Sequence, residues 1–80
     1  MAKLLKTDGS TVEDVDISTL KSMQDLVGGY IELVYLPDQK VFIVNEEGIL
    51  NNLASNDLAT EIYGHLIVGD VILANTSEIN

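Results

Sequence analysis

The sequence predicts an α+β fold: a mostly antiparallel sheet of about five strands with two short helices, in the order β-β-α-β-β-α-β. Three observations predict it. An Asp-Gly pair joins two short apolar runs, two longer apolar runs flank Pro37-Asp38, and apolar residues twice recur at helical spacing before a glycine. Eighty residues without a linker or repeat indicate a single compact domain over residues 1–80. We expect its tail, residues 75–80, to be frayed.

The first two strands are expected at residues 3–6 and 11–17. Asp8-Gly9 lies between them, and a glycine in this position accepts the positive φ of a tight hairpin turn. In the second strand Val15 and Ile17 fall on one face and the aspartates between and before them on the other. The pattern therefore predicts a hairpin with one apolar face.

A helix is expected to follow, with Ser18 as its N-cap. Leu20, Met23 and Leu26 recur at helical spacing, and Gly28-Gly29 ends the helix. The two glycine amides have a second interpretation as a cradle for an anion.

The central hairpin is expected to join residues 30–36 to residues 41–44, with its turn at Pro37-Asp38. Both strands are apolar on both faces, apart from Glu32. Strands of this kind usually lie inside a sheet that is covered on both sides. We therefore expect both of them to be central strands.

The last third predicts an irregular segment over 49–55, a short helix over 57–63, and a strand pair or bent strand over 66–74. Ser55 or Asn56 would cap the helix, and Leu58, Ala59 and Ile62 would face inward. Gly69-Asp70 marks a kink or bulge in the last strand. Two short helices cover little of such a sheet, so either self-association or curling of the sheet must cover the rest.

Charge and composition exclude several classes of protein. Thirteen acidic residues against four lysines and no arginine give a net charge of −9, which argues against a basic patch for nucleic acid and against docking on anionic lipid. Cysteine is absent, so no cysteine-based zinc site can form. No segment is long and apolar enough for a signal peptide or a membrane span, and we expect a cytoplasmic location.

No catalytic constellation is visible. No serine lies in a nucleophile motif, no phosphate-binding loop is present, and His65 is the only histidine. The carboxylate pairs Asp14/Asp16 and Glu46/Glu47 are the candidates for acid–base work. Glu61 is the one local partner for His65 in metal ligation. We expect no enzyme activity, no cofactor and no metal site.

The candidate binding residues are polar side chains of the segment after the central hairpin, together with two tyrosines. An Asn-rich loop both donates and accepts hydrogen bonds, and tyrosine is enriched at interfaces. An ordinary irregular connection would look the same. The candidates are Tyr30, Asn45, Glu46, Glu47, Asn51, Asn52, Asn56 and Tyr63. Tyr35 is expected to serve in packing instead.

The string GGYIE at 28–32, Leu36-Pro37, and IVNEEG at 43–48 resemble a family of small domains of unknown function found in phages, prophages, plasmids and their bacterial hosts. The spacing from Asn56 to Ala59 and the segment 67–70 are also similar to that family. Its members often have prolines near the segment matched by 53–55 and basic residues where Asp57 and Leu58 stand here. The resemblance implies a mobile-element protein in a bacterial cytoplasm and transfers no catalytic residue.

Three functions are compatible with these observations. The first is a non-catalytic interaction protein, with homo-oligomerisation as an option, that occupies a host protein, such as a defence factor, or sequesters a small molecule. The second is an acidic mimic of DNA, although the acids of residues 41–80 are scattered rather than aligned. The third is a small nucleotide-acting enzyme that uses carboxylates. We prefer the first, with a host protein or a small-molecule ligand as the partner.

Overall fold

Five antiparallel strands form one sheet in the computed structural model, which describes residues 2–79. The strands are β1 (Lys3–Leu5), β2 (Thr11–Glu13), β3 (Ile31–Leu36), β4 (Lys40–Asn45) and β5 (Val71–Asn75). The helices are α1 (Leu20–Val27), α2 (Asp57–Tyr63) and the short 3-10 helix η1 (Thr76–Glu78). The element order confirms the predicted α+β class. The strand order across the sheet is β2-β1-β5-β4-β3, so β2 and β3 are its two edges.

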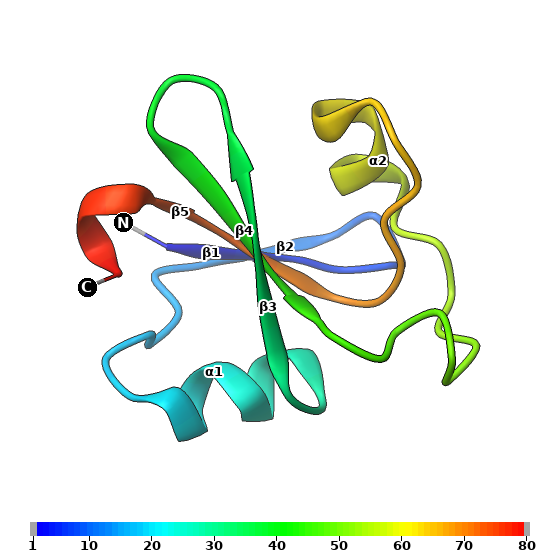
Figure 1. Ribbon diagram of the computed structural model, residues 1–80, viewed down its shortest axis with the longest axis horizontal. Coiled ribbons are helices and arrows are strands. Elements are labelled where there is room, and N and C mark those ends of the chain that lie inside the picture. The colour runs from blue at the N-terminus through cyan, green and yellow to red at the C-terminus, as the bar shows by residue number, and fades with distance from the viewer. Residues whose placement is uncertain (1, 80) are drawn as a thin grey trace.

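The two helices cover opposite faces of the sheet, as Figure 1 shows with α1 on one side and α2 on the other. Val41 and Ile43 of β4 belong to the core on the α1 side, where Met23 and Val27 pack. Phe42 and Val44 belong to the core on the α2 side, where Ala59 packs. Because successive side chains of a strand point to opposite faces of the sheet, these four consecutive apolar residues are divided between two cores.

The structure confirms the predicted central position for only one of the two strands of the central hairpin. Val41, Phe42, Ile43 and Val44 of β4 are buried, as expected for a strand covered on both faces. β3 is an edge strand, and Tyr35, which was expected to serve in packing, is 65% exposed. Both strands are equally apolar, so only the pairing of β4 with β5 decides which of them lies inside.

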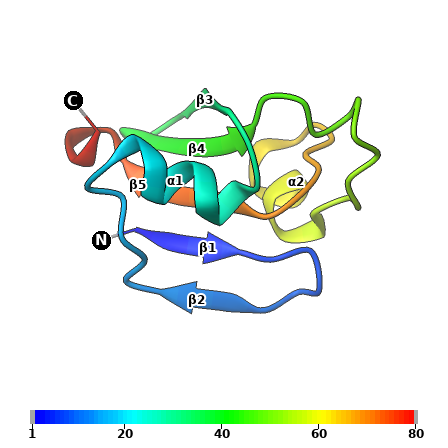
Figure 2. The ribbon, with the colours of Figure 1, turned by 90° about the horizontal axis from the view of Figure 1, so that it is seen from below.

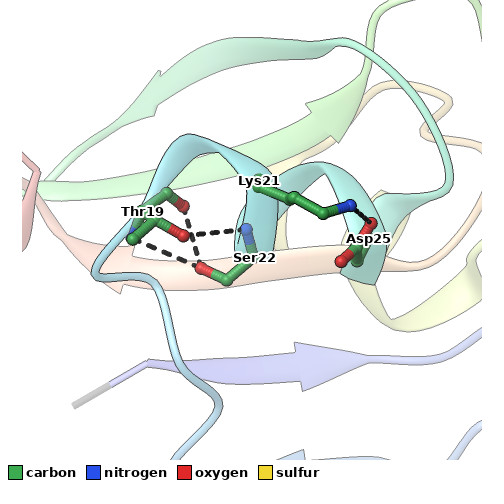
Figure 3. A network of polar contacts seen from close by, with 4 residues as sticks. All are labelled: Thr19, Lys21, Ser22 and Asp25. Atoms are coloured by element: carbon green, nitrogen blue, oxygen red, sulfur yellow. Dashed lines mark hydrogen bonds and ion pairs between the residues drawn. The ribbon is translucent and has the colours of Figure 1, made fainter.

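The first helix begins one residue later than the sequence predicts, so Ser18 is not the N-cap. Thr19 Oγ1 accepts from the Ser22 amide at 3.0 Å, and Ser22 Oγ accepts from the Thr19 amide, which completes a capping box (Figure 3). The Ser18 amide instead donates to the Asp16 carboxylate at 2.8 Å. Lys21 and Asp25 form an exposed ion pair of 3.4 Å one turn apart on the same helix.

Several boundaries also differ from the prediction. β2 ends at Glu13, where Asp14 adopts a φ of 56°; the Val15 amide still donates to the Ala2 carbonyl at 3.1 Å, and Val15 and Ile17 pack on the α1-side core. Ile62, predicted to face inward, is 54% exposed. The segment 66–70 is not part of β5 but holds one isolated bridge, between Ser55 and Val68.

The chain continues from β5 into η1 and is described through residue 79, and residue 80 lies outside the described residues. The Asn75 amide donates to the Glu78 carboxylate at 3.1 Å, and this bond holds the pKa of Glu78 below its ordinary value. Ile79 packs against the α1-side core. Figure 2 shows η1 at the end of β5, on the same side of the molecule as the start of β1.

The turn between β3 and β4 contains a strained residue that offers a stability test. Gln39 has a φ of 60°, which is costly for a side chain that gains no local hydrogen bond from it. We expect Gln39→Gly to raise the free energy of unfolding by about 0.5–1 kcal/mol in urea denaturation. Asp38→Gly, at a φ of 63°, is the matched control and should gain less, because aspartate tolerates this region better. A loss of stability in Gln39→Gly would contradict the assigned turn.

Candidate functional site

A polar pocket of about 490 Å³ lies where the end of α1, the start of β3 and the loop after β4 meet. It brings together four of the eight predicted site residues from two parts of the chain. The residues that line this polar pocket are Gln24, Asp25, Gly28, Gly29, Tyr30, Asn45, Glu47 and Asn51. Sequence reasoning missed Gln24 and Asp25, because polar residues at these positions are ordinary in an amphipathic helix; Gln24 is half-buried and Asp25 is exposed.

Asn45 fixes the geometry of the polar pocket. Its side chain donates from Nδ2 to the Val27 carbonyl at 3.2 Å, and its Oδ1 accepts from the Glu47 amide at 2.8 Å. One buried carboxamide therefore ties the end of α1 to the loop that carries Glu47. Gly29 lies against it, since a Cβ there would come within 3.0 Å of Asn45 Nδ2.

The two glycines before Tyr30 end the helix and do not present free amides. Gly28 has a φ of 84°, and the amides of Gly28 and Gly29 both donate to the Gln24 carbonyl, at 2.8 and 3.1 Å. The helix-stop interpretation is confirmed. An anion cradle needs these N–H groups to point at a ligand, so that alternative is not supported by this geometry.

Tyr30 and Glu47 are accessible side chains of the polar pocket, as are Asp25 and Asn51. Tyr30 is 68% exposed, while its carbonyl accepts from the Glu46 amide at 2.8 Å and so fixes the backbone. The Glu47 side chain is exposed, and its backbone is held in place by the hydrogen bond from its amide to Asn45 Oδ1. Rigid backbone with free side chains is the arrangement expected of a recognition surface.

The other four predicted residues lie elsewhere. Glu46 lines a smaller cavity on the α2 side, of about 190 Å³, with Glu32, Ile49 and Leu66 among its neighbours. Asn52 is exposed at a φ of 54° in the loop. Tyr63 is on α2, where its ring meets that of His65 edge-on at 5.3 Å.

Asn56 is inside the protein, with 0% of its surface exposed. Its Oδ1 accepts from the Ala59 amide and caps α2, as predicted from sequence. Its Nδ2 donates to the carbonyls of Leu5 and Gly69, both at 2.8 Å. Asn56 therefore joins β1, α2 and the approach to β5, and it is a structural residue rather than a contact for a ligand.

The candidate residues for catalysis are not assembled. Glu46 and Glu47 line different cavities, and His65 pairs with Tyr63 instead of with a carboxylate. Within residues 2–79, no group of three or more histidine, cysteine, aspartate or glutamate side chains could hold a metal ion. The same part of the chain contains no helix long and apolar enough to cross a membrane.

Several other carboxylates accept hydrogen bonds from backbone amides. Asp8 accepts from the hydroxyl and the amide of Ser10, and these bonds lower its pKa. Hydrogen bonds from Ser18 lower the pKa of Asp16 in the same way. Asp70 accepts from the Thr7 amide at 3.0 Å. These acids shape turns and loops, which accounts for their scattered positions along the chain.

An open groove of about 640 Å³ lies between the start of α1, β3 and η1, and its lining combines apolar side chains with the polar residues Ser18, Thr19 and Glu78. We call it the β3 groove. Its apolar lining comes from Ile17, Leu20, Met23, Ile31, Leu33, Tyr35 and Ile79. Sequence reasoning missed it because it depends on β3 being an edge strand.

Comparison with known proteins gives one match. A protein-family model described as "Domain of unknown function (DUF3846)" matches residues 1–80. Neither the curated proteins nor the solved structures contain a match to the chain. The description of the family assigns no activity to its members.

Proposed function

Since the chain belongs to the DUF3846 family, which carries no assigned activity, we propose from the site that it is a non-catalytic interaction protein. It is encoded by a phage or another mobile element and acts in the cytoplasm of the bacterial host cell. There it binds to a host protein and blocks that protein's surface. A host defence factor is the kind of target that fits this setting. The resemblance to phage and plasmid proteins supports the setting, and the polar pocket supports the mode of action.

The observation that carries this proposal is the chemistry of the polar pocket. Its lining holds two carboxylates, Asp25 and Glu47, three carboxamides and the exposed ring of Tyr30, and none of its described lining residues is basic. Carboxylates and amide oxygens accept charge-assisted hydrogen bonds, and a tyrosine face attracts a cation. The pocket is therefore complementary to an arginine or lysine side chain of a partner protein.

The charge of the whole protein supports the same kind of partner. A net charge of −9 on 80 residues attracts a basic surface over a distance, and it speeds association at low ionic strength. The exposed pair of Lys21 and Asp25 is weak, since the two side chains are 83% and 67% accessible. Asp25 can therefore exchange Lys21 for a partner's arginine.

The test is native mass spectrometry of the protein recovered from host cells, with single substitutions in the polar pocket. We expect a basic protein to be retained by the wild type, and about a tenfold or greater loss of affinity in Glu47→Gln and in Tyr30→Ala. Glu46→Gln is the matched control, because it removes the neighbouring charge outside the polar pocket. Binding should also weaken as salt is raised.

Three outcomes would contradict the proposal. Retention of the same partner at equal affinity by Glu47→Gln and Tyr30→Ala would place the contact elsewhere. A retained small molecule without a protein would favour sequestration of a ligand. Turnover of a nucleotide that Glu46→Gln or Glu47→Gln abolishes would instead indicate an enzyme.

A further inference from the structure

The two edges of the sheet are protected to very different degrees. β2 has three residues, ends in Glu13 and is followed by Asp14, whose positive φ turns the chain away. β3 has six residues in unbroken register with β4, and Glu32 is its only charge. Natural sheets usually blunt an edge with lysine, proline, a bulge or shortness. β3 has none of these within its length, so its free edge is suited to pairing.

The backbone of β3 presents three residues to this edge. The Glu46 amide donates to the Tyr30 carbonyl at 2.8 Å, which makes Tyr30 and Glu46 a hydrogen-bonded pair. Such pairs alternate along an antiparallel ladder, so Glu32, Val34 and Leu36 also bond to β4. The N–H and C=O groups of the intervening residues, 31, 33 and 35, point away from β4.

The same three residues are apolar and line the β3 groove. Leu33 is 38% exposed, Tyr35 is 65% exposed, and Ile31 is partly buried against the α1-side core. Main-chain donors and acceptors therefore lie next to uncovered apolar side chains. A strand added to this edge would form hydrogen bonds with these main-chain donors and acceptors and would cover the apolar side chains.

We propose that a second copy of this chain pairs with β3 through its own β3, antiparallel, about a twofold axis at Leu33. Leu33 then faces the partner's Leu33, and Ile31 faces the partner's Tyr35. All three outward-facing residues of each copy are paired, and the two sheets join into one. Each Tyr35 ring extends over the open side of the other copy's β3 groove, in a cross-strand contact with a β-branched residue.

The sequence of β3 is self-complementary in this register and poorly so in the neighbouring ones. With the axis at Leu33, Glu32 faces the partner's Val34, so the two like charges are kept apart. An axis at Glu32 would oppose the two carboxylates directly. An axis at Val34 would place Ile31 opposite the partner's Pro37, which has no N–H to donate. Charge and hydrogen bonding thus favour one twofold arrangement.

The dimer should strengthen with salt. Each copy carries a charge of −9, and screening reduces the repulsion between the copies. A complex with a basic partner has the opposite dependence. The proposal does not rest on the proposed function, because the polar pocket could bind its target in a monomer or in a dimer. The direction of the salt effect distinguishes the two.

The first test is sedimentation equilibrium of the purified protein over a wide concentration range. We expect a dimer of twice the 8.7 kDa chain mass, and a dissociation constant raised about 100-fold or more by Leu33→Lys, since the change occurs twice at the interface centre. Val12→Lys is the matched control on the other edge and should leave the dimer intact. Its side chain is 44% exposed, and it changes net charge equally. A monomer at every concentration, or a dimer indifferent to Leu33→Lys, would overturn the proposal.

The second test reads the register directly. The chain has no cysteine, so an introduced one reports only its own contacts. Leu33→Cys should form an intermolecular disulfide, since hydrogen-bonded antiparallel neighbours lie at a Cα separation of about 5.5 Å. Ile31→Cys mixed with Tyr35→Cys should cross-link, whereas either alone should not. Equal cross-linking of Ile31→Cys with itself would refute the register.

Discussion

Replacing Asn56 by alanine is expected to lower the free energy of unfolding by about 3–7 kcal/mol. The substitution removes the cap of α2 at Ala59 and both donors to the carbonyls of Leu5 and Gly69. A lost N-cap costs about 1 kcal/mol, and each buried carbonyl left without a partner about 1–3 kcal/mol. A domain of this size has about 4–12 kcal/mol in total, so the variant should be close to unfolded.

Urea denaturation followed by far-ultraviolet circular dichroism measures this effect. Asn51→Ala, an exposed asparagine in the neighbouring loop, is the control and should stay within about 0.5 kcal/mol of the wild type. Asn56→Asp keeps the cap acceptor but loses both donors, and its acid must be protonated to donate again. We therefore expect it to be less destabilised in mildly acidic buffer than at neutral pH. An Asn56→Ala variant as stable as Asn51→Ala would show that these bonds contribute little.

Gly69→Ala is expected to cost about 2–4 kcal/mol, from two separate causes. Gly69 has a φ of 78°, and an added Cβ would come within 2.8 Å of Leu53 Cδ1. The first cause is strain in the backbone itself. The second is a collision with a side chain that packs beside the start of β5.

Two other glycines separate these causes. Gly64 has a φ of 89° and open space around it, so Gly64→Ala should show the backbone cost alone, about 1 kcal/mol. Gly48 carries no such φ, but its Cβ would come within 2.8 Å of Val68 Cγ2, so Gly48→Ala should show the collision alone. Thermal denaturation of the three variants measures both terms. If Gly69→Ala is no more destabilising than Gly64→Ala, Leu53 moves aside without cost.

The locally determined parts of the fold could be predicted from the sequence. The turn at Asp8-Gly9, the helix stop at Gly28 and the cap at Asn56 each depend on residues within four positions of one another. The predicted N-cap at Ser18 was wrong by one residue, because Ser18 and Thr19 are equivalent by residue type. They are distinguished by the capping box of Thr19 with Ser22 and by the bond from the Ser18 amide to Asp16.

The parts that depend on distant pairing could not be predicted. β3 and β4 have the same apolar character, and only the contact of β4 with β5, some thirty residues later, makes one central and the other an edge. Asn56 was expected in a binding site because the bonds to Leu5 and Gly69 lie 51 and 13 residues away in sequence. The polar pocket was found in part, since Asn45, Glu47 and Asn51 are close along the chain. The contribution of α1 to the polar pocket could not be predicted, because it depends on the hydrogen bond from the Asn45 side chain to the Val27 carbonyl.

Asn45 and Asn56 together have a consequence for how this surface can evolve. Both are buried and make hydrogen bonds to main-chain atoms, so each of them holds one end of the segment 46–55. These bonds do not depend on the identity of most side chains in the segment. Exposed positions of that segment can therefore accept substitutions while the framework keeps its shape. Selection by a changing target would then act on this segment, as it does on the hypervariable loops of an antibody.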